Sequence, residues 1–158
     1  MDLLNGRNRR SRSSSGRARG ILFVTSSYDK AFALDARSGK FLWKYERDLP
    51  DRAVGMACCD AVNRGGALYG DKFYFGTIDA HVVALNAKTG KVAWDTKVAE
   101  YADGITITGA PIVVKGNVIA GMTAGEFGAR GRLIAVNAET WENPLDQLHG
   151  SRPGRAWQ

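Results

Sequence analysis

Two adjacent cysteines, Cys58 and Cys59, open the run C-C-D-A-V-N-R-G, which ends at Gly65. Adjacent cysteines cannot form an ordinary disulfide, because their Cα atoms lie only about 3.8 Å apart, below the usual window of about 4.4–6.8 Å. A bond between them would close a strained ring, and strained disulfides are commonly labile, redox-active or functional. On the pair alone, two reduced and buried cysteines that pack as small apolar side chains are the favoured interpretation.

A glycine-rich segment, residues 121–131, brings a carboxylate at Glu126 and a guanidinium at Arg130. Glycine lets the backbone approach a ligand closely. A glutamate on such a loop could bind a hard cation, because these ions prefer oxygen ligands. A solvated acid paired with Arg130 explains the same residues equally well. Residues 106–111, T-I-T-G-A-P, place hydroxyls before an expected strand, where β-propensity alone also accounts for them.

Short runs rich in Val, Ile, Phe and Tyr predict β-strands throughout residues 21–140, and turn residues separate these runs. No segment keeps a helical period, so the sequence predicts an all-β body. The expected strands are 21–25, 31–34, 41–45, 72–77, 81–85, 92–96, 111–114, 118–122 and 133–136.

The body also repeats. The string A-L-D-A-R-S-G-K-F-L-W, which starts at Ala33, recurs 51 residues later as A-L-N-A-K-T-G-K-V-A-W from Ala84. A third copy starts at Ala135 and matches as far as Thr140. A period of about 40–50 residues with several strands in each unit is typical of propeller blades.

The repeated string also predicts its own geometry. The side chain of Asp35 or Asn86 can hydrogen-bond a tight turn in which the following glycine has a positive φ. The tryptophan then returns on the next strand as an apolar wedge between blades. Because a closed propeller needs about four to eight blades, we expect a partial β-propeller of two to three four-stranded antiparallel blades.

Length and charge divide the chain of 158 residues into three parts. The net charge of +6 comes mostly from residues 1–20, where six arginines and one aspartate give +5. This Arg/Ser-rich arm is expected to be disordered. Residues 21–140 carry 14 basic and 13 acidic side chains, and residues 141–158 carry two of each. A nucleic-acid partner is not expected, because such proteins usually spread basic residues over a folded face. No apolar stretch of about 18 residues predicts a transmembrane helix.

The repeats, the C-C-D-x-V-N-R-G run and the G-E-F-G-x-R-G loop together resemble the quinoprotein alcohol dehydrogenases, which depend on pyrroloquinoline quinone (PQQ). The resemblance covers about residues 20–140. It implies an eight-bladed propeller with Trp-docking motifs, with PQQ near the central axis and Ca²⁺ or another metal ion beside it. The implied chemistry is oxidation of an alcohol to an aldehyde.

The resemblance also implies the roles of individual residues. Cys58 and Cys59 would form a vicinal disulfide packed on one face of PQQ, and Glu126 would ligate the metal. The other cofactor-binding residues that it implies are Arg64, Thr108, Thr123, Ala124 and Gly125.

The remaining parts of the family site are not matched in this sequence. The catalytic aspartate of the family lies in later blades, so no catalytic residue is expected here. One glutamate is too few for a hard cation that takes about six or more oxygens. The isolated chain is therefore expected to be inactive.

The resemblance further implies a small alcohol as substrate, a cytochrome as electron acceptor and a periplasmic location. No signal peptide precedes the body, so a product of this length could remain cytoplasmic. The alternative function is a non-enzymatic β-propeller scaffold for protein interaction, which would need neither the cysteine pair nor the Glu126 loop.

Residues 141–158 leave the repeat. Where the pattern predicts G-K-x-x-W, the chain reads W-E-N-P-L from Trp141. A one-base shift of the reading frame can restore G-K-T-R-W at that place, and a similar shift of residues 8–14 gives a plausible strand. We therefore expect a frameshift at the tail, which the coding DNA tests directly.

Overall fold

The structure is a computed structural model that describes residues 15–18, 20–56, 61–123, 128 and 131–141. Its first sheet contains β1 (Ser15–Ala18), β2 (Ile21–Ser26), β3 (Lys30–Asp35) and β4 (Phe41–Tyr45). Its second sheet contains β5 (Gly66–Tyr69), β6 (Lys72–Gly76), β7 (His81–Asn86) and β8 (Val92–Lys97). Its third sheet contains β9 (Ile112–Val114), β10 (Asn117–Met122) and β11 (Arg132–Asn137).

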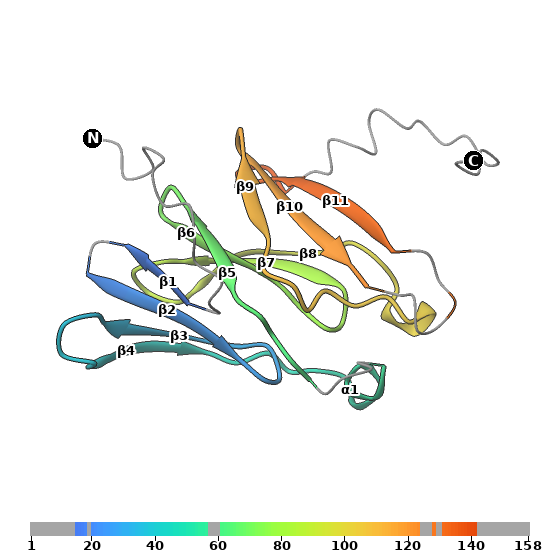
Figure 1. The fold of residues 1–158 in the computed structure, drawn as a ribbon, viewed down its shortest axis with the longest axis horizontal. Coiled ribbons are helices and arrows are strands. Elements are labelled where there is room, and N and C mark those ends of the chain that lie inside the picture. The colour runs from blue at the N-terminus through green and yellow to red at the C-terminus, as the bar shows by residue number, and fades with distance from the viewer. Residues whose placement is uncertain (1–14, 19, 57–60, 124–127, 129–130, 142–158) are drawn as a thin grey trace.

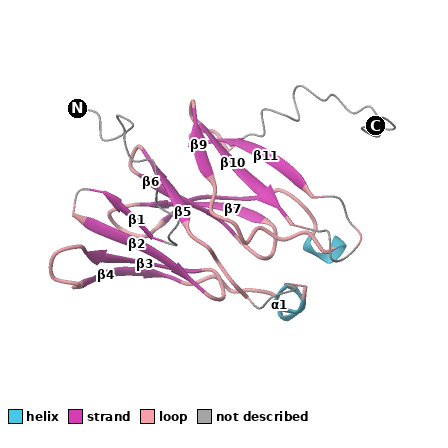
Figure 2. Cartoon of the chain, in the orientation of Figure 1, coloured by secondary structure: helices cyan, strands magenta, loops and turns pink. Residues whose placement is uncertain are grey.

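All three sheets are antiparallel meanders, and the second lies between the first and the third (Figure 1). This arrangement confirms the expected partial β-propeller with four-stranded blades for the first two sheets. In the described residues the third sheet has three strands. Two short helices, α1 (Asp51–Gly55) and η1 (Tyr101–Asp103), lie in the connections between the sheets (Figure 2).

Two strands and both short helices were not predicted from the sequence. The expectation of a disordered arm over residues 1–20 is wrong for Ser15–Ala18, because this segment pairs with β2 in the register Ser15↔Val24. The edge of an existing sheet offers unpaired backbone groups, so a segment of low β-propensity can still form a strand there. The same reason applies to β5, which begins at Gly66 and pairs with β6.

The repeated turns have the predicted geometry. The Asp35 Oδ1 accepts hydrogen bonds from the backbone N–H groups of Arg37 at 3.1 Å and Ser38 at 2.7 Å. Asn86 and Asn137 form the same pair of bonds in the second and third turns. Gly39 and Gly90 both have a φ of 71°.

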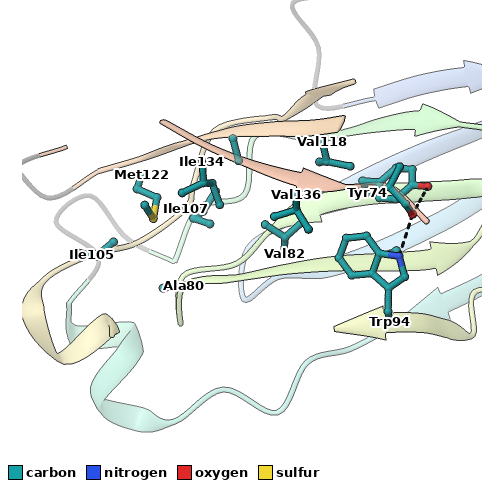
Figure 3. Packing of buried hydrophobic residues seen from close by; sticks show 13 residues of the cluster. Tyr74, Ala80, Val82, Trp94, Ile105, Ile107, Val118, Met122, Ile134 and Val136 are labelled. Atoms are coloured by element: carbon teal, nitrogen blue, oxygen red, sulfur yellow. Dashed lines mark hydrogen bonds between the residues drawn. The ribbon is translucent and has the colours of Figure 1, made fainter. Parts of the chain in front are cut away.

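Each repeated tryptophan lies between two sheets, as the sequence predicts, and also bonds the turn of the next sheet, which the sequence did not predict. The Trp43 indole N–H donates to the Ala87 carbonyl at 3.0 Å, and that of Trp94 donates to the Ala138 carbonyl at 3.1 Å. Trp94 belongs to the apolar cluster between the second and third sheets (Figure 3). Trp43 belongs to the cluster between the first and second sheets, where the rings of Phe23 and Phe73 stack at 5.3 Å.

Trp141 occupies the glycine position of the third turn. Its backbone N–H donates to the Asn137 carbonyl at 3.0 Å, as Gly90 does to Asn86 at 2.8 Å. Its φ is 55°, a left-handed conformation that costs a residue with a Cβ roughly 1–2 kcal/mol. The repeat therefore forces a bulky residue into a conformation that suits glycine.

We expect Trp141→Gly to raise the free energy of unfolding by about 1 kcal/mol, because glycine adopts this φ without strain. The urea unfolding midpoint measures the change. Trp141→Ala is the matched control, because it removes the 55% exposed indole but keeps the Cβ. An equal gain from alanine would show that the exposed ring, and not the backbone, is the cause.

Candidate cofactor site

Asn63 holds the segment that follows the cysteine pair between the first two sheets. Its side chain is buried and donates to Asp29 Oδ1 and to the Gly76 carbonyl, both at 2.8 Å. Its Oδ1 accepts from the Gly65 N–H at 3.2 Å. Its own carbonyl accepts from the Thr25 hydroxyl at 3.4 Å. These bonds fix the backbone on both sides of Arg64.

The turn that contacts this segment is strained. Tyr28 and Asp29 have φ values of 63° and 51°, although neither is glycine. The Tyr28 N–H donates to the Ala61 carbonyl at 2.8 Å, and Asp29 Oδ2 accepts from the Ile78 N–H at 2.7 Å. Such backbone strain persists only where surrounding contacts hold it, and it is often found at functional sites.

Arg64 and Thr108 form a double contact. The Arg64 backbone N–H donates to the Thr108 carbonyl at 2.9 Å, and its guanidinium donates to the Thr108 hydroxyl at 2.8 Å. Arg64 is exposed, so its other N–H groups are accessible from solvent. Ile107, beside Thr108, is fully buried against Gly76, where an added Cβ would lie 2.0 Å from the Ile107 Cγ2. Close packing therefore fixes the segment that carries Thr108.

Thr123 is joined to the same segment. Thr106 and Thr123 exchange both backbone hydrogen bonds, at 2.9 and 3.1 Å, and their hydroxyl oxygens lie 2.6 Å apart. Thr106 is two residues from Thr108, so the structure brings Arg64, Thr108 and Thr123 to one region. These are the three predicted cofactor residues that the structure describes.

The other predicted site residues lie outside the described residues. They are Cys58, Cys59, Ala124, Gly125 and Glu126. By sequence they flank the structured site, because the cysteines precede Ala61 and Glu126 follows Thr123. In the described ranges, no group of three or more His, Cys, Asp or Glu side chains could hold a metal ion.

Sequence reasoning missed a charged network beside this site. Arg47 donates from Nε to both Asp79 carboxylate oxygens at 2.8 and 2.9 Å, and from Nη1 to Asp95 at 2.7 Å. His81 Nδ1 lies 2.6 Å from the other Asp95 oxygen. Burial raises the pKa of Asp95, but the bonds from His81 and Arg47 outweigh it and hold that pKa below its usual value. No motif signals this network, because its residues come from separate turns and strands.

Burial raises the pKa of Asp29 from 3.8 to about 6, against the lowering effect of the Asn63 and Ile78 hydrogen bonds. Between about pH 4 and pH 6 the folded chain therefore binds more protons than the unfolded chain. The stabilising contribution of protonated Asp29 is complete below about pH 4 and is lost as the pH rises through 6.

We expect acidification from pH 7 to about pH 4.5 to raise the free energy of unfolding of the unaltered chain, relative to that of Asp29→Asn, by on the order of 2 kcal/mol. The asparagine of the variant cannot titrate. Urea unfolding of both proteins across this range measures the difference. Parallel pH profiles would contradict the raised pKa.

The arrangement of sheets, turns and tryptophans defines a β-propeller repeat protein. The PQQ_2 family model, described as outer membrane protein assembly factor BamB, matches residues 17–155. The chain therefore belongs to this family.

Among curated relatives, the chain is 50% identical over 134 residues to quinoprotein alcohol dehydrogenase PedH of Pseudomonas putida, covering 82% of this chain and 22% of PedH. A solved europium-containing methanol dehydrogenase is 39% identical with a TM-score of 0.77, covering 82% of this chain and 23% of that one. The BamB structure from Moraxella catarrhalis covers 82% of this chain and 38% of its own, with a TM-score of 0.63 and 21% identity, and shows the fold alone.

These similarities confirm the predicted resemblance to the quinoprotein alcohol dehydrogenases. The chain spans about a fifth of the length of the curated relatives it matches. In the part of the chain that the structure describes, no helix is both long enough and apolar enough to cross a membrane.

Proposed function

We propose that this chain supplies one side of the PQQ site of a quinoprotein alcohol dehydrogenase, and that the chain alone does not oxidise alcohols. The observation that carries the proposal is the double hydrogen bond between Arg64 and Thr108, on the segment that Thr106 joins to Thr123, in a chain with this similarity to PedH. The non-enzymatic scaffold has no comparable support, because the likeness to BamB is one of fold only.

The described residues fit such a cofactor. PQQ carries carboxylates and quinone oxygens, which accept hydrogen bonds. The Arg64 guanidinium has several N–H donors, and the Thr108 hydroxyl, which accepts from Arg64, can donate its own proton. The Thr123 hydroxyl donates to the Thr106 carbonyl at 3.2 Å, so Thr123 would help to position the segment that carries Thr108. When bound, PQQ would supply the chemistry of the reaction by accepting hydride from the alcohol carbon.

The chain's own residues would bind and orient the cofactor. Thr108 would hold the Arg64 guanidinium in place for a charge-assisted hydrogen bond, and Asn63 would hold the backbone beside it. We further propose that Cys58 and Cys59 form a vicinal disulfide against PQQ, that Ala124 and Gly125 line the pocket, and that Glu126 ligates Ca²⁺ or another metal. The remaining oxygen ligands would come from outside this chain, because such a cation takes about six or more.

The substrate, the electron acceptor and the location are proposed on the same basis. We infer a small alcohol as substrate, a cytochrome as acceptor and the periplasm as the location of the complete enzyme.

Titration of the chain with PQQ, with and without Ca²⁺, tests the proposal through quenching of tryptophan fluorescence. We expect weak binding, with a dissociation constant of about 0.1–1 mM, because only one side of the site is present. Arg64→Met and Thr108→Val should each weaken binding several-fold. Arg37→Met, in the exposed turn of the first sheet, is the matched control and should leave it unchanged.

Equal binding by all four proteins would overturn the assignment of Arg64 and Thr108. A dye-linked assay with ethanol, PQQ and Ca²⁺ tests the second half of the proposal. Measurable turnover by the 158-residue chain would overturn the expected lack of activity.

A further inference from the structure

Asp29 is a buried carboxylate to which the proposed cofactor chemistry gives no direct part. It is 0% exposed and adopts a φ of 51° in the turn between β2 and β3. Its two oxygens accept from different partners, Oδ1 from the Asn63 side-chain amide at 2.8 Å and Oδ2 from the Ile78 N–H at 2.7 Å. Because both partners are N–H donors, the site requires two acceptors, which an ionised carboxylate provides.

The first of these bonds leads to Arg64. The Asn63 amide nitrogen donates both to Asp29 and to the Gly76 carbonyl. The amide oxygen of the same side chain accepts from the Gly65 N–H. Arg64 lies between Asn63 and Gly65, so its backbone follows the position of this amide. Asp29 Oδ1 therefore supports the segment that presents the Arg64 guanidinium.

The second bond leads to Thr108. Ile78 lies in the turn between β6 and β7, residues 77–80, and is 0% exposed. In the same turn the Thr77 carbonyl accepts from the Ile107 N–H at 3.1 Å, and Ile107 directly precedes Thr108. Asp29 Oδ2 therefore supports the turn that holds the Thr108 segment.

The charged network braces the same turn from its other side. The Thr77 hydroxyl donates to Asp79 Oδ1 at 2.5 Å, and Asp79 is paired with Arg47 at 2.8 Å. After the larger effects of burial and hydrogen bonding, Asp79 raises and Arg47 lowers the pKa of Asp29. A close-packed turn that is held from both sides transmits a displacement of its support instead of absorbing it.

We propose that Asp29 is a positioning residue, whose two carboxylate oxygens hold the Arg64 and Thr108 segments at the separation at which these two residues bond each other. Those bonds are the backbone contact at 2.9 Å and the guanidinium contact at 2.8 Å. The expected effect on PQQ rests on the proposed function, because Arg64 and Thr108 are the residues assigned to the cofactor. The strained φ of Asp29 fits this role, since glycine would adopt that φ freely but would provide no acceptor.

Amide hydrogen exchange followed by NMR at about pH 7.5 provides the test, because the pKa of Asp29 is raised only to about 6 and its carboxylate is then ionised. Asp29→Asn keeps the shape but turns one acceptor into a donor, so one of the two partners loses its bond. The ratio of the exchange rates at the Arg64 and Gly90 N–H groups should rise about ten-fold. Gly90 is the internal reference, because its N–H bonds the Asn86 carbonyl in the turn at the other end of β7.

Val83→Ala is the matched control. Val83 is 0% exposed in the apolar cluster between the first and second sheets, so its truncation lowers stability but leaves both bonds of Asp29 in place. The exchange ratio of this variant should equal that of the unaltered chain. With the folded fraction taken into account, Asp29→Asn should bind PQQ several-fold more weakly than the unaltered chain, and Val83→Ala should bind it equally well.

An exchange of the two side chains tests the pair directly. Asn63→Asp alone places two carboxylates face to face. When Asp29→Asn is added, the new amide can donate to the new carboxylate and still accept from the Ile78 N–H, and the other carboxylate oxygen can accept from the Gly65 N–H. Exchange at Gly65 should therefore be several-fold slower in the double variant than in Asn63→Asp, a coupling that a space-filling role of Asp29 would not produce.

The positioning role is overturned if Asp29→Asn leaves the exchange ratio unchanged or if the double variant shows no recovery. Circular dichroism checks that each variant is folded. If Asp29→Asn loses strand signal, the unaltered chain provides the measurement, because a change to about pH 5 protonates Asp29 and weakens one of its acceptors. The same exchange ratio should then rise, and a constant ratio would overturn the role.

The PQQ titration separates this role from the proposed function. Equal PQQ binding by Arg64→Met and the unaltered chain would overturn the proposed function, and the exchange ratio would still decide whether Asp29 positions Arg64. Weaker binding by Arg64→Met together with unchanged binding by Asp29→Asn would leave the proposed function standing and would overturn the part of Asp29 in it.

Discussion

Replacement of Arg47 by methionine is expected to lower the free energy of unfolding by about 3–5 kcal/mol, the cost of leaving a buried charge without its partner. The side chains of Arg47 and Asp79 are 9% and 7% exposed. Burial alone would lower the pKa of Arg47, but hydrogen bonds to Asp79 and Asp95 raise it, so the guanidinium stays charged. Because Arg47 follows the first sheet and Asp79 belongs to the second, the loss also weakens the contact between them.

Lys97→Met is the control for this prediction. Lys97 and Glu100 form an ion pair with side chains that are 46% and 60% exposed, and such pairs contribute about 0–1 kcal/mol. The double variant Arg47→Met, Asp79→Leu should recover much of the lost stability, because both charges of the buried pair are then removed. Urea unfolding measures all three, and an Arg47→Met protein as stable as Lys97→Met would contradict the prediction.

Gly90→Ala is expected to destabilise the chain by about 2–4 kcal/mol through two additive causes. A Cβ at a φ of 71° costs about 1 kcal/mol in backbone conformation. The same Cβ would lie 2.6 Å from Cδ2 of Trp43, and such overpacking typically costs about 1–3 kcal/mol more. The indole would have to move, which lengthens its hydrogen bond to Ala87.

Gly39→Ala separates these two causes. Gly39 has the same φ of 71° in an equivalent turn, but its Cβ would meet no heavy atom of the described residues within 4 Å. Only the backbone cost of about 1 kcal/mol should therefore appear. Equal destabilisation by both substitutions, measured as the shift in urea midpoint, would show that the indole contact adds nothing.

Most of the fold that could be predicted from the sequence followed from the repeated string. Two copies of one turn and tryptophan string were enough to predict the blades, the Asp35 and Asn86 turns and the contact of each indole with the next sheet. β1 and β5 were missed because they form by pairing with β2 and β6, and their own propensity is low.

The candidate site was predictable only in part. Resemblance to a family pointed to Arg64, Thr108 and Thr123, and in the structure Arg64 bonds Thr108 while Thr123 bonds Thr106, two residues away from Thr108. The resemblance gave no indication of Asn63, the buried residue that fixes the backbone around Arg64, because its partners Asp29 and Gly76 are distant in the sequence. The Arg47 network was missed for the same reason.

The three sheets pack against one another in the order of the sequence, and this arrangement has a consequence for local unfolding. Among the described residues the apolar clusters join each sheet to its sequence neighbour, so stability approximates a sum of sheet terms and nearest-neighbour terms. The second sheet is stabilised by both apolar clusters, whereas the first and the third each have one. Amide hydrogen exchange should therefore be slowest in β6 and β7, and the outer sheets should open by separate, lower-energy fluctuations that leave the middle sheet protected.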